Sequence, residues 1–250
     1  MFEVLPIPAF RDNYIWLLHN GKHAAVVDPG DALPVMQVLQ DLGLMLDTIL
    51  ITHHHDDHIS GVALLLGAWP VTVYAPRHAA HVFPHTLVEE GTQVLLPTLN
   101  TQFSVLAIPG HTLEHVAYYG ANCLFCGDTL FGAGCGRLFE GTPGQMFSSL
   151  QRLAALPPAT RVYCGHEYTE RNLGFALNLE PENGKLVARQ LDTVEKRSKG
   201  QPTLPTTIGL ELETNPFLRC SNASFQAASG IRNEDAVQVF AAIRKMRNDY

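Results

Sequence analysis

The sequence predicts a mixed α/β (or α+β) fold with a small helical segment at its C-terminal end. Over the first two thirds of the chain, short apolar runs bounded by glycine, proline or aspartate alternate with helix patterns. After Glu167 the strand signals fade and helix patterns take over. Three of the predicted strands end in a glycine that is followed by histidine or aspartate, so we expect a functional site beyond the strand ends.

The individual elements follow from hydrophobic periodicity and from turn residues. Asp31 is expected to cap the first helix and Gly43 to end it. A short helical segment is expected around His78, His81 and His85, which we interpret as surface histidines. The predicted strands cover residues 14–18, 24–27, 48–51, 71–74, 103–108, 117–119, 123–125 and 161–164, and the predicted helices cover residues 33–42, 62–66, 144–156, 170–179, 184–198 and 235–247.

Composition and charge restrict the class of protein. The 250 residues are 46% apolar and 16% charged, as in an ordinary globular protein, and the net charge of −7 argues against a nucleic-acid partner. Five cysteines lack the density of a disulfide framework and indicate a reducing compartment. Residues 1–10 do not resemble a signal peptide, and the longest apolar stretch, residues 62–75, is too short to span a membrane. We expect a cytoplasmic monomer without membrane partners.

A run of four histidines and two aspartates follows the third predicted strand. On an extended backbone alternate side chains face the same way, so His53 and His55 are expected to point to one place while His54 points away. Asp57 and His58 follow at the next turn and are expected at a second, neighbouring place. Imidazole nitrogen and carboxylate oxygen suit zinc, iron or manganese, and two ions roughly 3.5–4 Å apart fit this spacing.

Three other segments offer residues that can complete such a site. His111, Asp128 and His166 each stand directly after a glycine at the end of a predicted strand, where glycine permits a sharp exit. Each of them alone has an ordinary explanation as a turn or surface residue. Together with the histidine run they predict one metal site assembled from four segments.

The pattern Thr-His-x-His-x-Asp-His, with a later histidine, aspartate and histidine, resembles the metallo-β-lactamase superfamily. Within it the chain resembles the glyoxalase II (hydroxyacylglutathione hydrolase) family almost end to end. This resemblance implies a four-layered αβ/βα sandwich over residues 1–168 as the catalytic domain and a helical substrate-binding domain over residues 169–250. The stretches that carry it are residues 12–14, 27–30, 109–112, 125–131, 134–137, 140–142 and 165–169.

The resemblance also implies an activity and its metal ligands. The reaction is hydrolysis of the thioester S-D-lactoylglutathione, and of related 2-hydroxyacylglutathiones, to glutathione and D-lactate, the second step of methylglyoxal detoxification. Two divalent ions would be bound, zinc in the first place, with iron or manganese as alternatives. The ligands are His53, His55 and His111 for one ion, Asp57, His58 and His166 for the other, and Asp128 for both.

The expected chemistry follows from the two ions. A hydroxide that bridges them is a nucleophile at neutral pH, because coordination lowers the pKa of water toward about 7. Asp57 can orient this hydroxide by accepting a hydrogen bond. The leaving thiolate, whose conjugate acid has a pKa of about 8.5, departs without much help from a general acid. Asp28, at a strand end, is expected either as the carboxylate partner of one ligand histidine or as a plain turn cap.

Binding of the glutathione moiety is a further implication of the resemblance. Some family members have tyrosine where this chain has Phe139. Phenylalanine has no hydroxyl, so one hydrogen bond to the substrate is expected to be absent here. Glu114 replaces the usual glycine before His115, which affects the local turn. The C-terminal arginines also have a simpler interpretation, as cations that favour a helix C-terminus. The residues assigned to glutathione binding are Arg137, Tyr168, Arg244 and Arg247.

Other functions stay open at this point. A persulfide dioxygenase of the same superfamily would hold a single iron, and a ribonuclease or phosphodiesterase would need a basic face. A non-catalytic metal-binding module would close its sites with protein ligands. Cys123 and Cys126 suggest a redox or zinc pair, but residues three apart on a strand face opposite sides. Two buried thiols are therefore expected.

Overall fold

The computed structural model describes residues 2–78, 80–231 and 235–250. By its internal contacts the chain divides into two compact units. The first consists of residues 1–107 and 114–127, and the second of residues 108–113 and 128–250. The predicted domain boundary between residues 168 and 169 stays a prediction.

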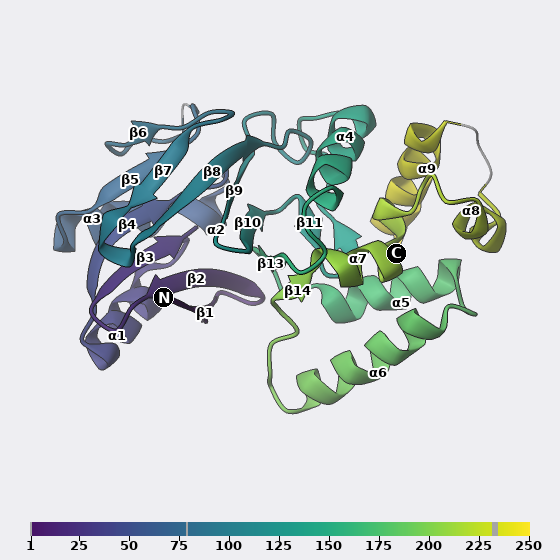
Figure 1. The fold of residues 1–250 in the computed structure, drawn as a ribbon, viewed down its shortest axis with the longest axis horizontal. Coiled ribbons are helices and arrows are strands. Elements are labelled where there is room, and N and C mark those ends of the chain that lie inside the picture. The colour runs from purple at the N-terminus through teal and green to yellow at the C-terminus, as the bar shows by residue number, and fades with distance from the viewer. Residues whose placement is uncertain (1, 79, 232–234) are drawn as a thin grey trace. The chain divides into compact units, whose positions relative to one another are not determined.

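The first unit contains a six-stranded mixed sheet in which the strands lie in chain order (Figure 1). Its first three strands are antiparallel, because tight turns join them. The following strands run parallel to β3, because helical crossovers connect β3 to β4 and β4 to β5. The strands are β1 (Glu3–Ala9), β2 (Asn13–His19), β3 (His23–Val27), β4 (Met45–Leu50), β5 (Thr72–Ala75) and β6 (Thr86–Leu87).

Two crossover helices, α1 (Ala32–Leu42) and α3 (Val62–Ala68), bury their apolar sides in the same core as this sheet. The side chain of Asp31 caps α1 by accepting from Leu33 N, and Gly43 ends the helix at a φ of 64°. The short helix α2 (Asp56–Ile59), which the sequence did not predict, precedes α3. The strand that leads to α2 is β4, so its end delivers the histidine run.

Four antiparallel strands of the first unit form a second layer. The hydroxyl of Tyr118 donates to Ile51 O at 2.9 Å, and Val116 N donates to Thr52 O at 2.9 Å. These bonds join the second layer to the end of β4, just before the histidine run. The strands are β7 (Gln93–Leu96), β8 (Thr101–Ala107), β9 (Val116–Gly120) and β10 (Cys123–Gly127), with the 3-10 turn η1 (Pro97–Leu99) between β7 and β8.

The second unit is mainly helical, and α5 and α6 pack against each other (Figure 1). The fully buried carboxylate of Glu211 accepts from Ala133 N at 2.8 Å and pairs with Arg189, so it ties a hairpin to the helices. Its elements are β11 (Leu130–Phe131), β12 (Gly134–Cys135), α4 (Pro143–Ala154), β13 (Arg161–Cys164), α5 (Thr169–Leu179), α6 (Gly184–Ser198), β14 (Thr206–Thr207), α7 (Ile208–Thr214), η2 (Pro216–Leu218), α8 (Ala223–Ser229) and α9 (Ala236–Asp249).

The predicted mixed α/β fold is confirmed, and the predicted strands and helices are present with small shifts at their ends. The helical segment expected around His78–His85 is wrong: the described residues between β5 and β6 contain no helix. The interpretation of His81 as a surface histidine is also wrong, because this residue is buried. β1 was missed because its two prolines lowered the strand signal; as an edge strand it tolerates them. No helix among the described parts of the chain is long and apolar enough to cross a membrane.

Candidate metal centre

The histidine run of the first unit leaves β4 in an extended conformation. His53 is buried, with 1% of its surface exposed, and His55 is half-buried. Nε2 of His53 and Nδ1 of His55 lie 3.2 Å apart, so the two imidazoles direct nitrogen atoms to the same point. The ring of His54 turns away and stacks on His78, with 3.5 Å between ring centroids and 11° between planes. This is the alternation expected of an extended backbone.

Asp57 and His58 lie on α2, where one helical turn takes them out of the extended run. Oδ2 of Asp57 is 3.6 Å from Nε2 of His58. The two side chains therefore direct ligand-type atoms to a common point. Gly30 explains why the helix fits there: a Cβ on this residue would stand 1.8 Å from the main-chain oxygen of Asp57. A side chain at position 30 would displace α2.

Asp28 fixes the orientation of two of these histidines. Its Oδ2 accepts from Nδ1 of His58 at 3.1 Å and from the hydroxyl of Thr52 at 2.7 Å. Because the Thr52 hydroxyl donates to Asp28, its oxygen is left to accept from Nδ1 of His53, at 3.0 Å. Both imidazoles thus carry their proton on Nδ1 and leave Nε2 with a lone pair. Of the two interpretations of Asp28, the carboxylate partner of a histidine is confirmed.

The second unit holds the other predicted ligands. Oδ2 of Asp128 lies 3.5 Å from Nε2 of His111 and 3.2 Å from Nε2 of His166. Nδ1 of His111 donates to the main-chain oxygen of Arg137 at 2.9 Å, which leaves its Nε2 as the ligand-type nitrogen. One carboxylate oxygen thus stands between two imidazole nitrogens. All three residues are at least nine-tenths buried.

Gly136 is a structural requirement of this arrangement. A Cβ at this position would stand 1.9 Å from the main-chain oxygen of Asp128 and 3.1 Å from Nδ1 of His111. The main chain at Gly136 therefore passes so close to Asp128 and His111 that no side chain fits at position 136.

The residues predicted to bind glutathione have different environments in the second unit. Arg137 is exposed, and the ring of Tyr168 stacks on His166 at 4.7 Å between centroids. Arg244 is only 5% exposed, and it donates to the main-chain oxygen of Cys135 at 2.7 Å. The side chain of Arg247 donates twice to Oδ1 of Asn172. Burial and then the charge of Arg171 lower the pKa of Arg247 to about 10, so it stays a cation at neutral pH.

Two residues near the ligands were missed from the sequence. The buried ring of His115 stacks on His53 at 4.5 Å and 15°. The amide of Asn13 contacts Asp57. His115 appeared only as the residue after the departure at Glu114, and the one local signal for Asn13 is a polar residue at the start of an apolar strand.

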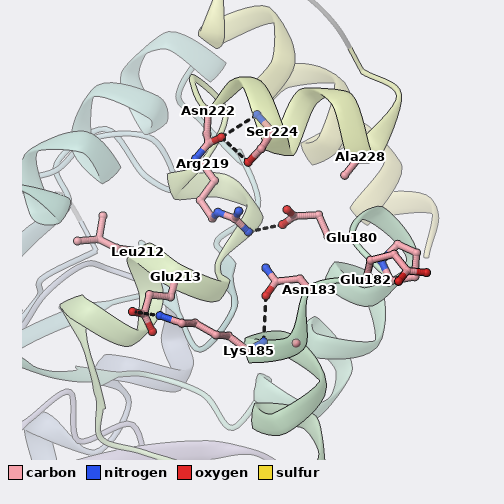
Figure 2. A pocket seen from close by; sticks show the side chains of 12 residues that line it. Glu180, Glu182, Asn183, Lys185, Leu212, Glu213, Arg219, Asn222, Ser224 and Ala228 are labelled. Atoms are coloured by element: carbon pink, nitrogen blue, oxygen red, sulfur yellow. Dashed lines mark hydrogen bonds and ion pairs between the residues drawn. The ribbon is translucent and has the colours of Figure 1, made fainter.

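A cleft of about 790 Å³ lies among the helices of the second unit (Figure 2). Its charged groups satisfy each other: Arg219 pairs with Glu180, and Lys185 pairs with Glu213. Asn183 caps α6 by accepting from the main chain. None of the predicted metal ligands lines this cleft, and four of its charged side chains form two ion pairs, so we assign no ligand to it.

Comparison with known proteins identifies the class. A family model described as "Metallo-beta-lactamase superfamily" matches residues 9–166, and one described as "Hydroxyacylglutathione hydrolase C-terminus" matches residues 167–250. The solved structure of ETHE1 from Myxococcus xanthus is 26% identical, with a TM-score of 0.66 over 99% of this chain and 98% of that one. The di-iron-bound form of TTHA1623 is 29% identical, with a TM-score of 0.62 over 86% and 100%.

The chain therefore belongs to the metallo-β-lactamase superfamily, and the expected αβ/βα sandwich with a helical C-terminal region is confirmed. Its histidine and aspartate clusters are those of a protein that binds divalent metal. It is 58% identical to the hydroxyacylglutathione hydrolase of Methylobacillus flagellatus over 100% of both chains. It is 50% identical to that of Albidiferax ferrireducens over 99% of this chain and 100% of the other. Within the superfamily the chain is a member of the hydroxyacylglutathione hydrolase family, and it is a thioester hydrolase.

Proposed function

We propose that the protein hydrolyses S-D-lactoylglutathione and related 2-hydroxyacylglutathiones to glutathione and a 2-hydroxy acid, the second step of methylglyoxal detoxification. The observation that carries this proposal is identity of 58% with a named hydroxyacylglutathione hydrolase over the full length of both chains. The match of residues 167–250 to the C-terminal model of the same family supports it, because that part distinguishes the family within the superfamily.

We further propose that the chain binds two divalent ions, zinc in the first place. The di-iron-bound form of a 29% identical protein supports the number of ions and keeps iron as an alternative. The proposed ligands are His53, His55 and His111 for one ion, Asp57, His58 and His166 for the other, and Asp128 for both.

The donor atoms within each unit fit such ions. The 3.2 Å between Nε2 of His53 and Nδ1 of His55 is close to the roughly 3.3–3.4 Å that separates two nitrogens bound to one tetrahedral zinc. Three of the histidines have their other ring nitrogen engaged by an acceptor, as ligand histidines do. Oδ2 of Asp128 within 3.5 Å of two imidazole nitrogens suits a shared carboxylate.

Two bound cations supply water activated at neutral pH and a Lewis acid for the thioester carbonyl. Asp57, an acceptor with a partly exposed carboxylate, can take a hydrogen bond from the attacking water and orient it. The departing thiolate of glutathione is a stable leaving group, so the chain needs no general acid beside it.

Glutathione recognition is proposed for Arg137, Tyr168, Arg244 and Arg247. Arg137 is exposed and carries a guanidinium fork that matches a carboxylate. The exposed ring of Phe139, which stands edge-on to His111 at 5.2 Å, offers apolar contact but no hydrogen bond. Arg244 donates to the main chain of Cys135 and Gly136, directly before Arg137, so it also orients that segment.

We propose that the protein acts in the cytoplasm as a monomer. The five cysteines are all buried and none of them forms a disulfide, which fits a reducing compartment.

The decisive experiment combines elemental analysis of the purified protein with hydrolysis assays. We expect two divalent ions per chain and turnover of S-D-lactoylglutathione, with much slower turnover of a lactoyl thioester that lacks the glutamyl and glycyl groups. One iron per chain, together with oxygen consumption in the presence of glutathione persulfide and no thioester turnover, would instead identify a persulfide dioxygenase.

A further inference from the structure

Asn13 contacts a proposed metal ligand through the nitrogen of its side-chain amide. Nδ2 donates to Oδ2 of Asp57 at 2.9 Å and lies 3.5 Å from the main-chain oxygen of the same residue. Both partners are acceptors, so the chemistry fixes which amide atom faces Asp57. Asn13 is 7% exposed and lies 44 positions earlier in the chain, at the start of β2.

The carboxylate of Asp57 needs such a partner. It extends from a four-residue helix, and its side chain is 41% exposed, so packing alone does not restrict its rotamers. The main chain of Asp57 is held by the close approach of Gly30, where a Cβ would stand 1.8 Å from Asp57 O. The side chain is held by Asn13. The oxygen that accepts from Asn13 is Oδ2, the one that lies 3.6 Å from Nε2 of His58.

We propose that Asn13 is a positioning residue that orients the Asp57 carboxylate for metal binding. This inference rests on the proposed function, in which Asp57 and His58 bind the same ion. An amide suits the role because it only donates toward Asp57, leaves the other lone pairs of the carboxylate available, and carries no charge. A carboxylate at position 13 would face Asp57 with like charge, and an alanine would remove the amide donor at this position.

Asn20 provides a matched control. It follows the other end of β2, and its Nδ2 donates to a distant acceptor, Thr98 O, at 2.8 Å. Asn20→Asp removes an amide donor just beyond the same strand without touching Asp57 or His58. A purely structural role for Asn13 predicts that variants at both positions change stability alone.

The test uses the full-length protein stripped of metal by chelation. Zn²⁺ is titrated by calorimetry and Co²⁺ by its visible absorption into wild type, Asn13→Asp, Asn13→Ala, Asn13→Ser and Asn20→Asp. We expect the Asn13 variants to weaken one of the two binding events by about 10–100-fold, as loss of an outer hydrogen-bond partner does, and to leave the other event unchanged. Asn20→Asp should bind both ions like the wild type. Urea unfolding of the metal-free forms identifies any variant that does not fold.

A double-mutant cycle makes the assignment specific to Asp57. In the Asp57→Ala background the further change Asn13→Ala should leave metal affinity unaltered, because the carboxylate that Asn13 orients is gone. The inference is overturned if folded Asn13 variants bind both ions within twofold of wild type, or if Asn13→Ala weakens binding equally in both backgrounds. Failure of the wild type to bind two ions or to hydrolyse the thioester would overturn the proposed function, which is a separate result.

Discussion

Oδ2 of Asp128 lies 3.2 Å from Nε2 of His166 and 3.5 Å from Nε2 of His111. Removal of its charge should therefore affect both ions. We expect Asp128→Asn to lose at least part of the metal and to reduce kcat by several orders of magnitude, because two divalent cations repel each other without a shared anion. Paired metal analysis and turnover measurements check this.

His54→Asn is the control for Asp128→Asn, since the ring of His54 stacks on His78. It should keep near-normal metal content and turnover. If Asp128→Asn kept two ions per chain and near-normal turnover, Asp128 would not be a ligand shared by both ions.

The two C-terminal arginines should behave differently from each other. Arg244→Ala removes a buried cation that donates to the oxygen of Cys135, so it should lower the free energy of unfolding by about 1.5–3 kcal/mol and raise KM. Arg247→Ala removes a half-buried cation held by Asn172, so it should raise KM more than it lowers kcat, at a smaller stability cost.

Denaturant unfolding and steady-state kinetics on the same preparations separate these two effects. An unchanged KM in both folded variants would remove the arginines from glutathione binding and leave them as cations of a helix terminus.

Gly136→Ala tests the close packing around Asp128. The new Cβ would stand 1.9 Å from the main-chain oxygen of Asp128, so the main chain must move and carry the carboxylate with it. We expect a destabilisation of about 1–3 kcal/mol and reduced metal content. Gly144→Ala is the control, because its Cβ would meet no atom closer than 4.0 Å and the residue lies in α4. Equal metal content in both folded variants would contradict the expectation.

His81 should make the protein sensitive to acid. Burial lowers the pKa of this imidazole from 6.5 to about 4, while its Nδ1 donates to Pro76 O at 2.8 Å; the imidazoles of His85, His78 and His54 add smaller lowering effects. Above pH 6.5 the residue is neutral in both states. As the pH falls from 6.5 toward 4, the unfolded chain binds a proton that the folded chain does not, so stability is lost over this window.

His81 should lower the free energy of unfolding by roughly 2–3 kcal/mol over this pH window, because one pKa unit corresponds to about 1.4 kcal/mol. His81→Asn keeps a neutral donor for Pro76, so its unfolding free energy in metal-free protein should fall less between pH 6.5 and pH 4 than that of wild type. Parallel pH dependences for the two proteins would show that His81 does not titrate differently on folding.

Local features of the sequence were enough for most of the longer strands and helices and for the segments that carry the candidate ligands. The alternation of His53, His54 and His55 follows from the period of an extended chain, and the glycines before Asp128 and His166 mark strand exits. These are properties of neighbouring residues, so a single sequence contains them. The helix α2 was missed because four residues are too few to establish a helical period.

The sequence by itself thus determined the class of fold, the kind of candidate metal ligand and the segments that supply these ligands. The tertiary structure decided which side chains orient those ligands. Asp28 accepts a hydrogen bond from His58, 30 positions later in the chain, and Asn13 donates one to Asp57, 44 positions later. Arg244 donates to the main-chain oxygen of Cys135, 109 positions earlier. Hydrogen bonds between such distant residues have no period and no local signal. They depend on the register of strands and on the close packing at Gly30 and Gly136, which only the folded chain specifies.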